Sequence, residues 1–130
     1  MNFRRPFWLR LKRDPSGSVA VEFALLLPVY IAFMFGIIEF GRMIWTRNTM
    51  EFAAETAARY GTVTSGATNA TVAAYALTQL IGIDSTGITF TATVAASTVT
   101  VVGTTTFTTL ISAYVPIPTT TLTVTATFAK

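Results

Sequence analysis

The chain has 130 residues, of which 52% are hydrophobic and 12% are charged, whereas ordinary soluble domains are about 25% charged. It contains no cysteine and no histidine, and beyond residue 60 its only charged side chains are Asp84 and Lys130. Acid–base catalysis needs a positioned titratable group, and metal sites need clustered His, Cys or carboxylates. The distal half can supply neither, so the sequence argues against an enzyme and predicts no metal or cofactor.

The basic residues are concentrated at the N-terminus. Residues 1–17 hold five cations against Asp14, a net charge of +4, whereas residues 18–130 hold four cations against five carboxylates, a net charge of −1. Cationic segments keep an N-terminus in the cytoplasm, so we interpret residues 1–17 as an irregular basic leader. No basic patch remains for phosphates, which argues against nucleic-acid binding.

Residues 18–38 are almost continuously apolar. Their 21 residues make a helix of about 31 Å, which is enough to cross a hydrocarbon core of about 30 Å. Glu22 lies inside this segment, where a charge costs about 2.5–3.5 kcal/mol and normally has a partner and a purpose. A secretory signal would need a small-x-small cleavage site after the apolar run, and residues 37–43 offer none. We therefore expect a retained transmembrane helix.

The helix is expected to continue outside the membrane to residue 60. Residues 41–60 contain no proline and are rich in helix-forming residues. Arg47–Glu51 and Glu55–Arg59 are i,i+4 pairs that support a helix. A stripe of small residues would allow close packing of another element, and Gly61 is a reasonable C-cap; the stripe consists of Ala53, Ala54, Ala57 and Ala58.

Residues 61–130 are predicted to form a threonine-rich head. Helical spacing of apolar residues indicates a short helix over residues 70–81, capped by Asn69. Strict alternation of apolar residues with threonine then predicts antiparallel strands over residues 88–94, 98–101 and 121–128. Gly103 suggests a bulge or a bend nearby, and Pro116 and Pro118 suggest an extended connection before the last strand. The expected fold class is α+β, with a head too small to be robust unless it packs on the long helix.

Three segments together resemble the TadE-like family: residues 17–28, Phe-Gly-Ile-Ile-Glu-Phe-Gly-Arg at 35–42, and Ala-Ala-Glu-Thr-Ala-Ala-Arg at 53–59. These proteins are minor pilins, or pseudopilins, of the bacterial tight-adherence (Flp) pilus system. The resemblance covers about residues 14–60, and both TadE and its sibling TadF fit it. It implies that the protein takes part in assembly of a type IV-like pilus.

The resemblance also implies roles for individual residues. A prepilin peptidase would cut after Gly17 and leave Ser18 as the mature N-terminus, with Glu22 at mature position five. Glu22 would then attract the α-amine of a neighbouring subunit, because pairing relieves the cost of both charges in lipid. The implied partners are the peptidase, other pilins, an inner-membrane platform and membrane lipid, with no small-molecule substrate. The implied location is the bacterial inner membrane, single-pass, with a cytoplasmic N-terminus, or the pilus itself.

Interpretations without a role in processing or assembly remain open for each of these residues. Gly17 fits a turn in an uncut leader, and Glu22 fits an interfacial residue that pairs with nothing. Glu39 is expected to be an interfacial charge beside Arg42, with contact to another pilin helix as the alternative. The threonine rows suit a wet sheet face by β propensity, although regular hydroxyls also suggest ligand binding.

Two other classes of protein compete with the pilin interpretation. The first is a permanently membrane-anchored envelope protein whose β head binds a ligand or a surface, with the leader left uncut. The second is a small secreted β protein released by signal peptidase, which the missing cleavage site disfavours.

Overall fold

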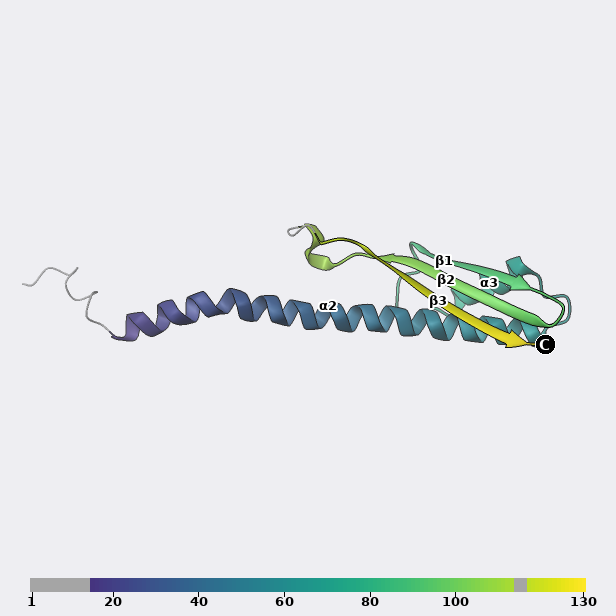
Figure 1. Cartoon of the computed structure of the whole chain (residues 1–130), viewed down its shortest axis with the longest axis horizontal. Helices are drawn as coiled ribbons and strands as arrows, with labels where there is room; N and C mark the ends of the chain where they lie inside the picture. Colours follow the sequence, from purple (N-terminus) through teal and green to yellow (C-terminus); the bar gives the residue numbers. More distant parts are fainter. Residues whose placement is uncertain (1–14, 114–116) are drawn as a thin grey trace, which may run out of the picture. The chain divides into compact units, whose positions relative to one another are not determined.

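The computed structural model describes residues 15–113 and 117–130, so most of the expected leader and Pro116 lie outside the described residues. The chain divides into two compact units, Met1–Ile38 and Glu39–Lys130. A long apolar helix, one short helix and a three-stranded antiparallel sheet confirm the predicted α+β class (Figure 1).

The long helix α2 spans Pro15–Val63. It begins three residues before Ser18, because proline is tolerated in the first helical turn, where its missing N–H would have no intrahelical partner. In the first unit every side chain from Gly17 to Ile38 is exposed, although most of these residues are apolar. A helix that is apolar on all sides is typical of a membrane span. The helix is long and apolar enough to cross a bilayer, and membrane helices tolerate an internal proline such as Pro28.

The second unit contains the rest of α2, whose end differs from the prediction. Gly61 is not the C-cap, since the helix continues through it to Val63. Gly61 is buried, and a Cβ at this position would lie 2.9 Å from a methyl of Val99 and 3.0 Å from one of Val72. The glycine therefore serves close packing of the head on the helix rather than helix termination.

The short helix α3 spans Asn69–Thr78, and its cap also differs from the prediction. Thr68, not Asn69, is the N-cap and forms a capping box with Thr71. The Asn69 side chain instead accepts a hydrogen bond of 2.8 Å from the backbone N–H of Val94. The asparagine therefore joins α3 to the end of β1.

The sheet is an antiparallel meander in the order β1-β2-β3. Its strands are β1 (Ile88–Val94), β2 (Thr98–Phe107) and β3 (Thr120–Ala129), which lie side by side in Figure 1. Alternate residues of β1 and β3 are buried, as the sequence pattern predicts. Gly103 makes no bulge, because it pairs in register with Phe90 and Val124. A Cβ there would lie 2.5 Å from the Phe90 ring, so the glycine makes room for that ring.

The hydrophobic core of the second unit lies between α2, α3 and one face of the sheet. The alanine stripe of α2 is fully buried in it, together with Met50. Val72 and Ala76 of α3 and the inward-facing residues of the strands complete the cluster. Small alanine side chains allow a sheet to approach a helix closely, so the head and this part of α2 form one folded body.

Candidate functional site

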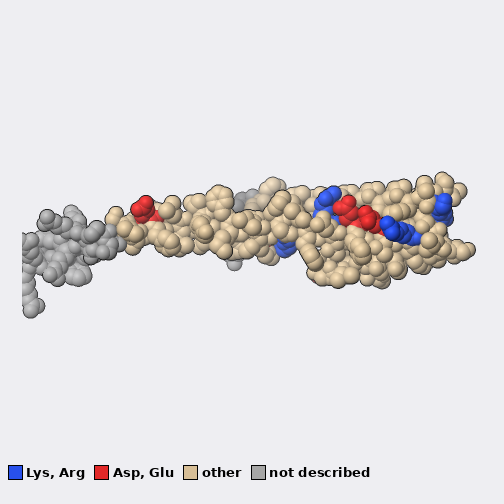
Figure 2. Space-filling view, turned by 90° about the horizontal axis from the view of Figure 1, so that it is seen from below, with Lys and Arg blue, Asp and Glu red and all other residues tan. Residues whose placement is uncertain are grey.

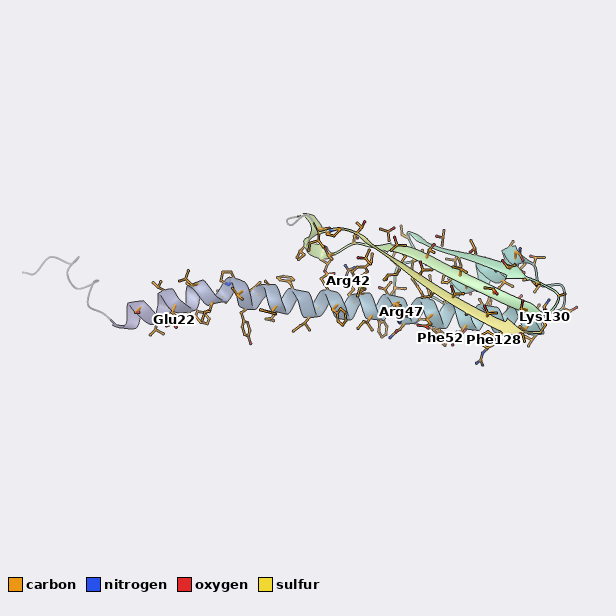
Figure 3. All side chains as sticks on the ribbon, in the orientation of Figure 1. Glu22, Arg42, Arg47, Phe52, Phe128 and Lys130 are labelled. Atoms are coloured by element: carbon orange, nitrogen blue, oxygen red, sulfur yellow. The ribbon has the colours of Figure 1, made fainter. Side chains whose placement is uncertain are left out.

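A polar cluster joins α2 to the segment that follows β2, at the start of the second unit. The Glu39 carboxylate accepts a hydrogen bond of 2.8 Å from the Arg42 guanidinium and one of 2.9 Å from the backbone N–H of Leu110. Arg42 also donates to the carbonyl oxygen of Thr108, and its guanidinium lies 4.4 Å from the centre of the Phe107 ring. Figure 3 labels Arg42 on the side of α2 that faces this segment.

Both partners of this ion pair are removed from water, but to different extents. Glu39 is only 7% exposed, whereas the Arg42 side chain is 38% exposed. Burial of the Glu39 carboxyl raises its pKa, but the hydrogen bonds from Arg42 and Leu110 outweigh burial and hold the pKa below its usual value. Because a buried carboxylate is tolerated only with such partners, the cluster positions the chain after β2.

The segment held by Glu39 is a short 3-10 helix, η1 (Leu110–Ala113), which the sequence pattern did not predict. Glu39 satisfies the first N–H of η1, and Arg42 satisfies the carbonyl two residues earlier. Both partners are backbone groups, so no residue type at positions 108 or 110 could have revealed them. The i,i+3 spacing of Glu39 and Arg42 was the only available signal. Pro118 lies beyond η1, outside regular secondary structure.

The processing and assembly residues expected from the sequence belong to the first unit. Gly17 and Ser18 lie inside the first turns of α2, and among the described residues a Cβ at Gly17 would meet no atom within 4 Å beyond its chain neighbours and local helix backbone. Glu22 is exposed, and within residues 15–113 and 117–130 it makes no hydrogen bond or ion pair. Figure 3 labels Glu22 on this unit. Glu22 therefore differs from Glu39, because each carboxylate oxygen of Glu39 accepts a hydrogen bond from its own chain.

A shallow cavity of about 330 Å³ lies beside the polar cluster in the second unit. Its lining includes Arg42, Trp45, Asp84 and Thr86. Asp84 accepts hydrogen bonds of 2.9 and 2.8 Å from the backbone N–H and hydroxyl of Thr86, and these bonds lower the pKa of its carboxyl. Asp84 thus stabilises its own turn. Among the described residues no three His, Cys, Asp or Glu side chains come close enough to hold a metal.

The outer face of the sheet carries rows of threonine that cross the strands. Thr89 and Thr104 share a hydrogen bond of 3.1 Å between their hydroxyls, and so do Thr100 and Thr127. Val102 interrupts the array, between Thr91 and Thr125 in register. These hydroxyls partly satisfy one another, as expected of threonine on a wet sheet face.

Comparison with known protein families finds a match for the N-terminal part of the chain. The family model described as TadE-like protein matches residues 17–59, which confirms the resemblance over the N-terminal helix. The match supports an association of the protein with the tight-adherence pilus system. No curated protein and no solved structure matches the chain.

Proposed function

We propose that this protein is a pilin-like subunit, a TadE-type minor pilin, that takes part in assembly of a tight-adherence pilus. The observation that carries the proposal is Glu22. It is an exposed carboxylate five residues after Gly17, on a helix whose other exposed side chains in residues 19–38 are mostly apolar. This carboxylate lies in the segment that the TadE-like family model matches.

Glu22 needs a partner that its own chain does not supply in the described residues. A carboxylate in lipid costs about 2.5–3.5 kcal/mol unless it is paired. Cleavage after Gly17 would create a new α-amine at Ser18, and an ammonium in the same layer is equally costly. Pairing of Glu22 with the Ser18 amine of a neighbouring subunit relieves both costs. The pair would set the axial offset between two subunits.

Processing must begin with local opening of the helix. The bond between Gly17 and Ser18 lies within α2, and a glycine in a helix costs about 1 kcal/mol relative to alanine. In the part of the chain that the structure describes, no atom beyond the chain neighbours and the local helix backbone lies within 4 Å of the Cβ position of Gly17. Both features support access of a prepilin peptidase to this bond. The basic residues before it keep this end in the cytoplasm, so the head lies outside the inner membrane.

The proposed partners follow from this arrangement. They are the peptidase, other pilins whose helices pack against the apolar surface of residues 18–38, and an inner-membrane platform that moves subunits out of the bilayer. The protein performs no chemistry itself. It enters the pilus or primes its assembly.

The intact mass of the protein extracted from membranes tests processing. Loss of residues 1–17 supports the proposal, and a full-length product contradicts it. The second outcome would favour a permanently anchored envelope protein, whose threonine-rich outer sheet face then becomes the candidate surface for a ligand. A cut beyond residue 38 would indicate a secreted β protein.

Substitution of Glu22 tests its role in assembly. Glu22→Ala should make membrane insertion easier by about 2.5–3 kcal/mol, while pilus assembly falls. Glu22→Asp keeps the charge and is the matched control, expected to retain more pili than Glu22→Ala. The measurements are membrane fractionation and pilus counts by electron microscopy. Normal piliation in Glu22→Ala would exclude the assembly role.

A further inference from the structure

Four charged side chains follow one another at four-residue intervals along α2. They run basic, acidic, acidic, basic, and we call them the charged row: Arg47, Glu51, Glu55 and Arg59. Between residues 43 and 130 the sequence has only two other charged side chains. The Arg47 and Glu51 side chains are 56% and 44% exposed, and Glu55 and Arg59 are exposed as well. The row is visible in Figure 2 as blue, red and blue atoms along the second unit.

Stabilisation of the helix itself does not explain the order of these charges. Arg47 and Glu51 are 3.7 Å apart but in the less favourable order, since an acidic residue preferably precedes its basic partner. Glu51 and Glu55 repel each other at i,i+4. In residues 15–113 and 117–130 Glu55 forms no ion pair, and Arg59 lies over the Phe128 ring at 5.0 Å. The repulsion between the two central carboxylates therefore offsets part of what their attraction to Arg47 and Arg59 contributes to the helix.

An exposed aromatic side chain accompanies the charged row. Phe52 follows Glu51 directly and is 53% exposed, the one large apolar side chain left exposed on α2 in the described stretch 46–62. Every neighbouring apolar residue of this stretch lies in the core or is small. An exposed aromatic group bordered by charged groups is the composition of a protein–protein contact.

Symmetry decides which kind of partner fits this face. Two copies anchored in one membrane with their heads on the same side have parallel helices. A closed parallel pair through one shared face is two-fold symmetric, so each residue lies level with its own counterpart. In such a level pair arginine would meet arginine and glutamate would meet glutamate at all four levels. With the four-residue offset of a Glu22–Ser18 pair, two copies would attract at two levels, but Glu55 would meet Glu51 between them. A parallel helix with the opposite order would be attracted at each level.

We propose that the charged row and Phe52 form a docking surface for the parallel helix of a different chain, whose charges run acidic, basic, basic, acidic at four-residue intervals. This inference rests on the proposed function, in which α2 packs against helices of other pilins, and it adds the chemistry of the partner. The surface favours this partner over a second copy of this chain, because a level copy is repelled at all four levels and an offset copy at one.

A charge-exchanged copy of this chain supplies a defined probe. The variant R47E/E51R/E55R/R59E has the same composition and net charge but presents the opposite order. Each copy carries N48C at an exposed position beside the row, and because the natural chain has no cysteine this is its only thiol. Differently tagged wild-type and exchanged copies are expressed together and oxidised in membranes. We expect the mixed disulfide dimer to exceed either homodimer by about fivefold.

Two further variants separate the aromatic contribution from general effects. F52S in both copies should reduce the mixed dimer about threefold or more, whereas V63S, at an 83% exposed apolar residue at the end of the helix, should leave it unchanged. Thermal unfolding of each variant head, followed by circular dichroism, confirms that the fold is intact. A random distribution of the three dimers, or no cross-linked product, would overturn the proposal.

Excess wild-type homodimer would assign this face to a second copy and would also overturn the proposal. The proposed function has its own readouts, which are removal of residues 1–17 and pilus counts. Charge-independent cross-linking with normal processing and piliation would overturn the docking surface alone. An uncut leader would overturn the pilin function alone, since the cross-linking pattern depends only on the two helices in the membrane.

Discussion

The two units place the same kinds of side chain in opposite surroundings. In the first unit, leucine, isoleucine and phenylalanine are exposed around the whole of α2, and one exposed carboxylate lies among them. In the second unit, α2 buries four alanines and Met50 in a core shared with the sheet, and its first carboxylate is bonded to the same chain. One continuous helix therefore has a first part with an exposed apolar surface and a second part that packs against its own head.

The largest expected effect is the loss of the head when α2 is removed. The alanine stripe and Met50 contribute five of the fully buried residues in the core cluster, so a fragment of residues 61–130 would expose the part of its sheet that α2 covers. A body of about 70 residues has little core to lose. We expect no cooperative thermal unfolding of this fragment. Cooperative unfolding together with dispersed amide NMR signals would show that the head folds alone.

The same substitution should have different effects in the two units. Ala57→Leu inserts three carbons where alanine is fully buried, and such overpacking costs about 1–3 kcal/mol. Ala24→Leu makes the same change on the exposed helix of the first unit and should leave unfolding of the head unaltered. Thermal unfolding of the full chain in detergent measures both. Equal effects would mean that the alanine stripe is not packed as described.

The two carboxylates at the ends of the apolar segment offer a second comparison. Glu39→Ala leaves the Leu110 N–H without its acceptor and leaves the Arg42 guanidinium with the Thr108 carbonyl alone, and an unsatisfied buried polar group costs about 1–3 kcal/mol. Glu22→Ala should not change unfolding of the head. Glu51→Ala is the surface control, because its ion pair is worth at most about 0.5 kcal/mol. Faster hydrogen exchange at Leu110 only in Glu39→Ala would locate the effect.

The smallest expected effect is a pH dependence of the head's thermal stability. Hydrogen bonds to the charged form hold the pKa of Glu39 below its unfolded value despite burial. A carboxyl with a lowered folded pKa stabilises the fold above its unfolded pKa, about 4.3, and this stabilisation is lost as pH falls through the folded pKa. The melting temperature should therefore be flat near neutrality and fall below about pH 4.5. Glu39→Gln should reduce that fall, leaving the part due to Asp84, whose pKa is also lowered by hydrogen bonds.

The elements of the fold were largely predictable because their signals are periodic. Alternation of threonine with apolar residues gave β1 and β3 their extent and their inward faces. The small-residue stripe predicted where the head packs on α2, and the apolar run predicted a helix of bilayer length. These patterns are local, so each is visible in a short window of sequence.

The role of single residues at close contacts was not predictable. Gly61 and Gly103 carry the composition of a helix end and a bulge, yet each lies where a neighbouring side chain needs its missing Cβ. Asn69 has the sequence position of a cap, but Thr68 has the extended backbone that an N-cap requires, and Asn69 bonds to β1 instead. Such roles depend on residues 10 or more positions away.

The sequence by itself determined the two kinds of surface on the long helix, because hydrophobicity and its period show which part is apolar on all sides and which part packs in a core. It also placed Glu22 five residues after Gly17, and the four charges of the row at four-residue intervals. Only the tertiary structure decided which charged side chains form hydrogen bonds within their own chain. Glu39 accepts a hydrogen bond from a backbone N–H 71 positions away, whereas the charged row lies outside the head's core. Every residue except proline has a backbone N–H, so the side-chain sequence could not indicate which one Glu39 would contact.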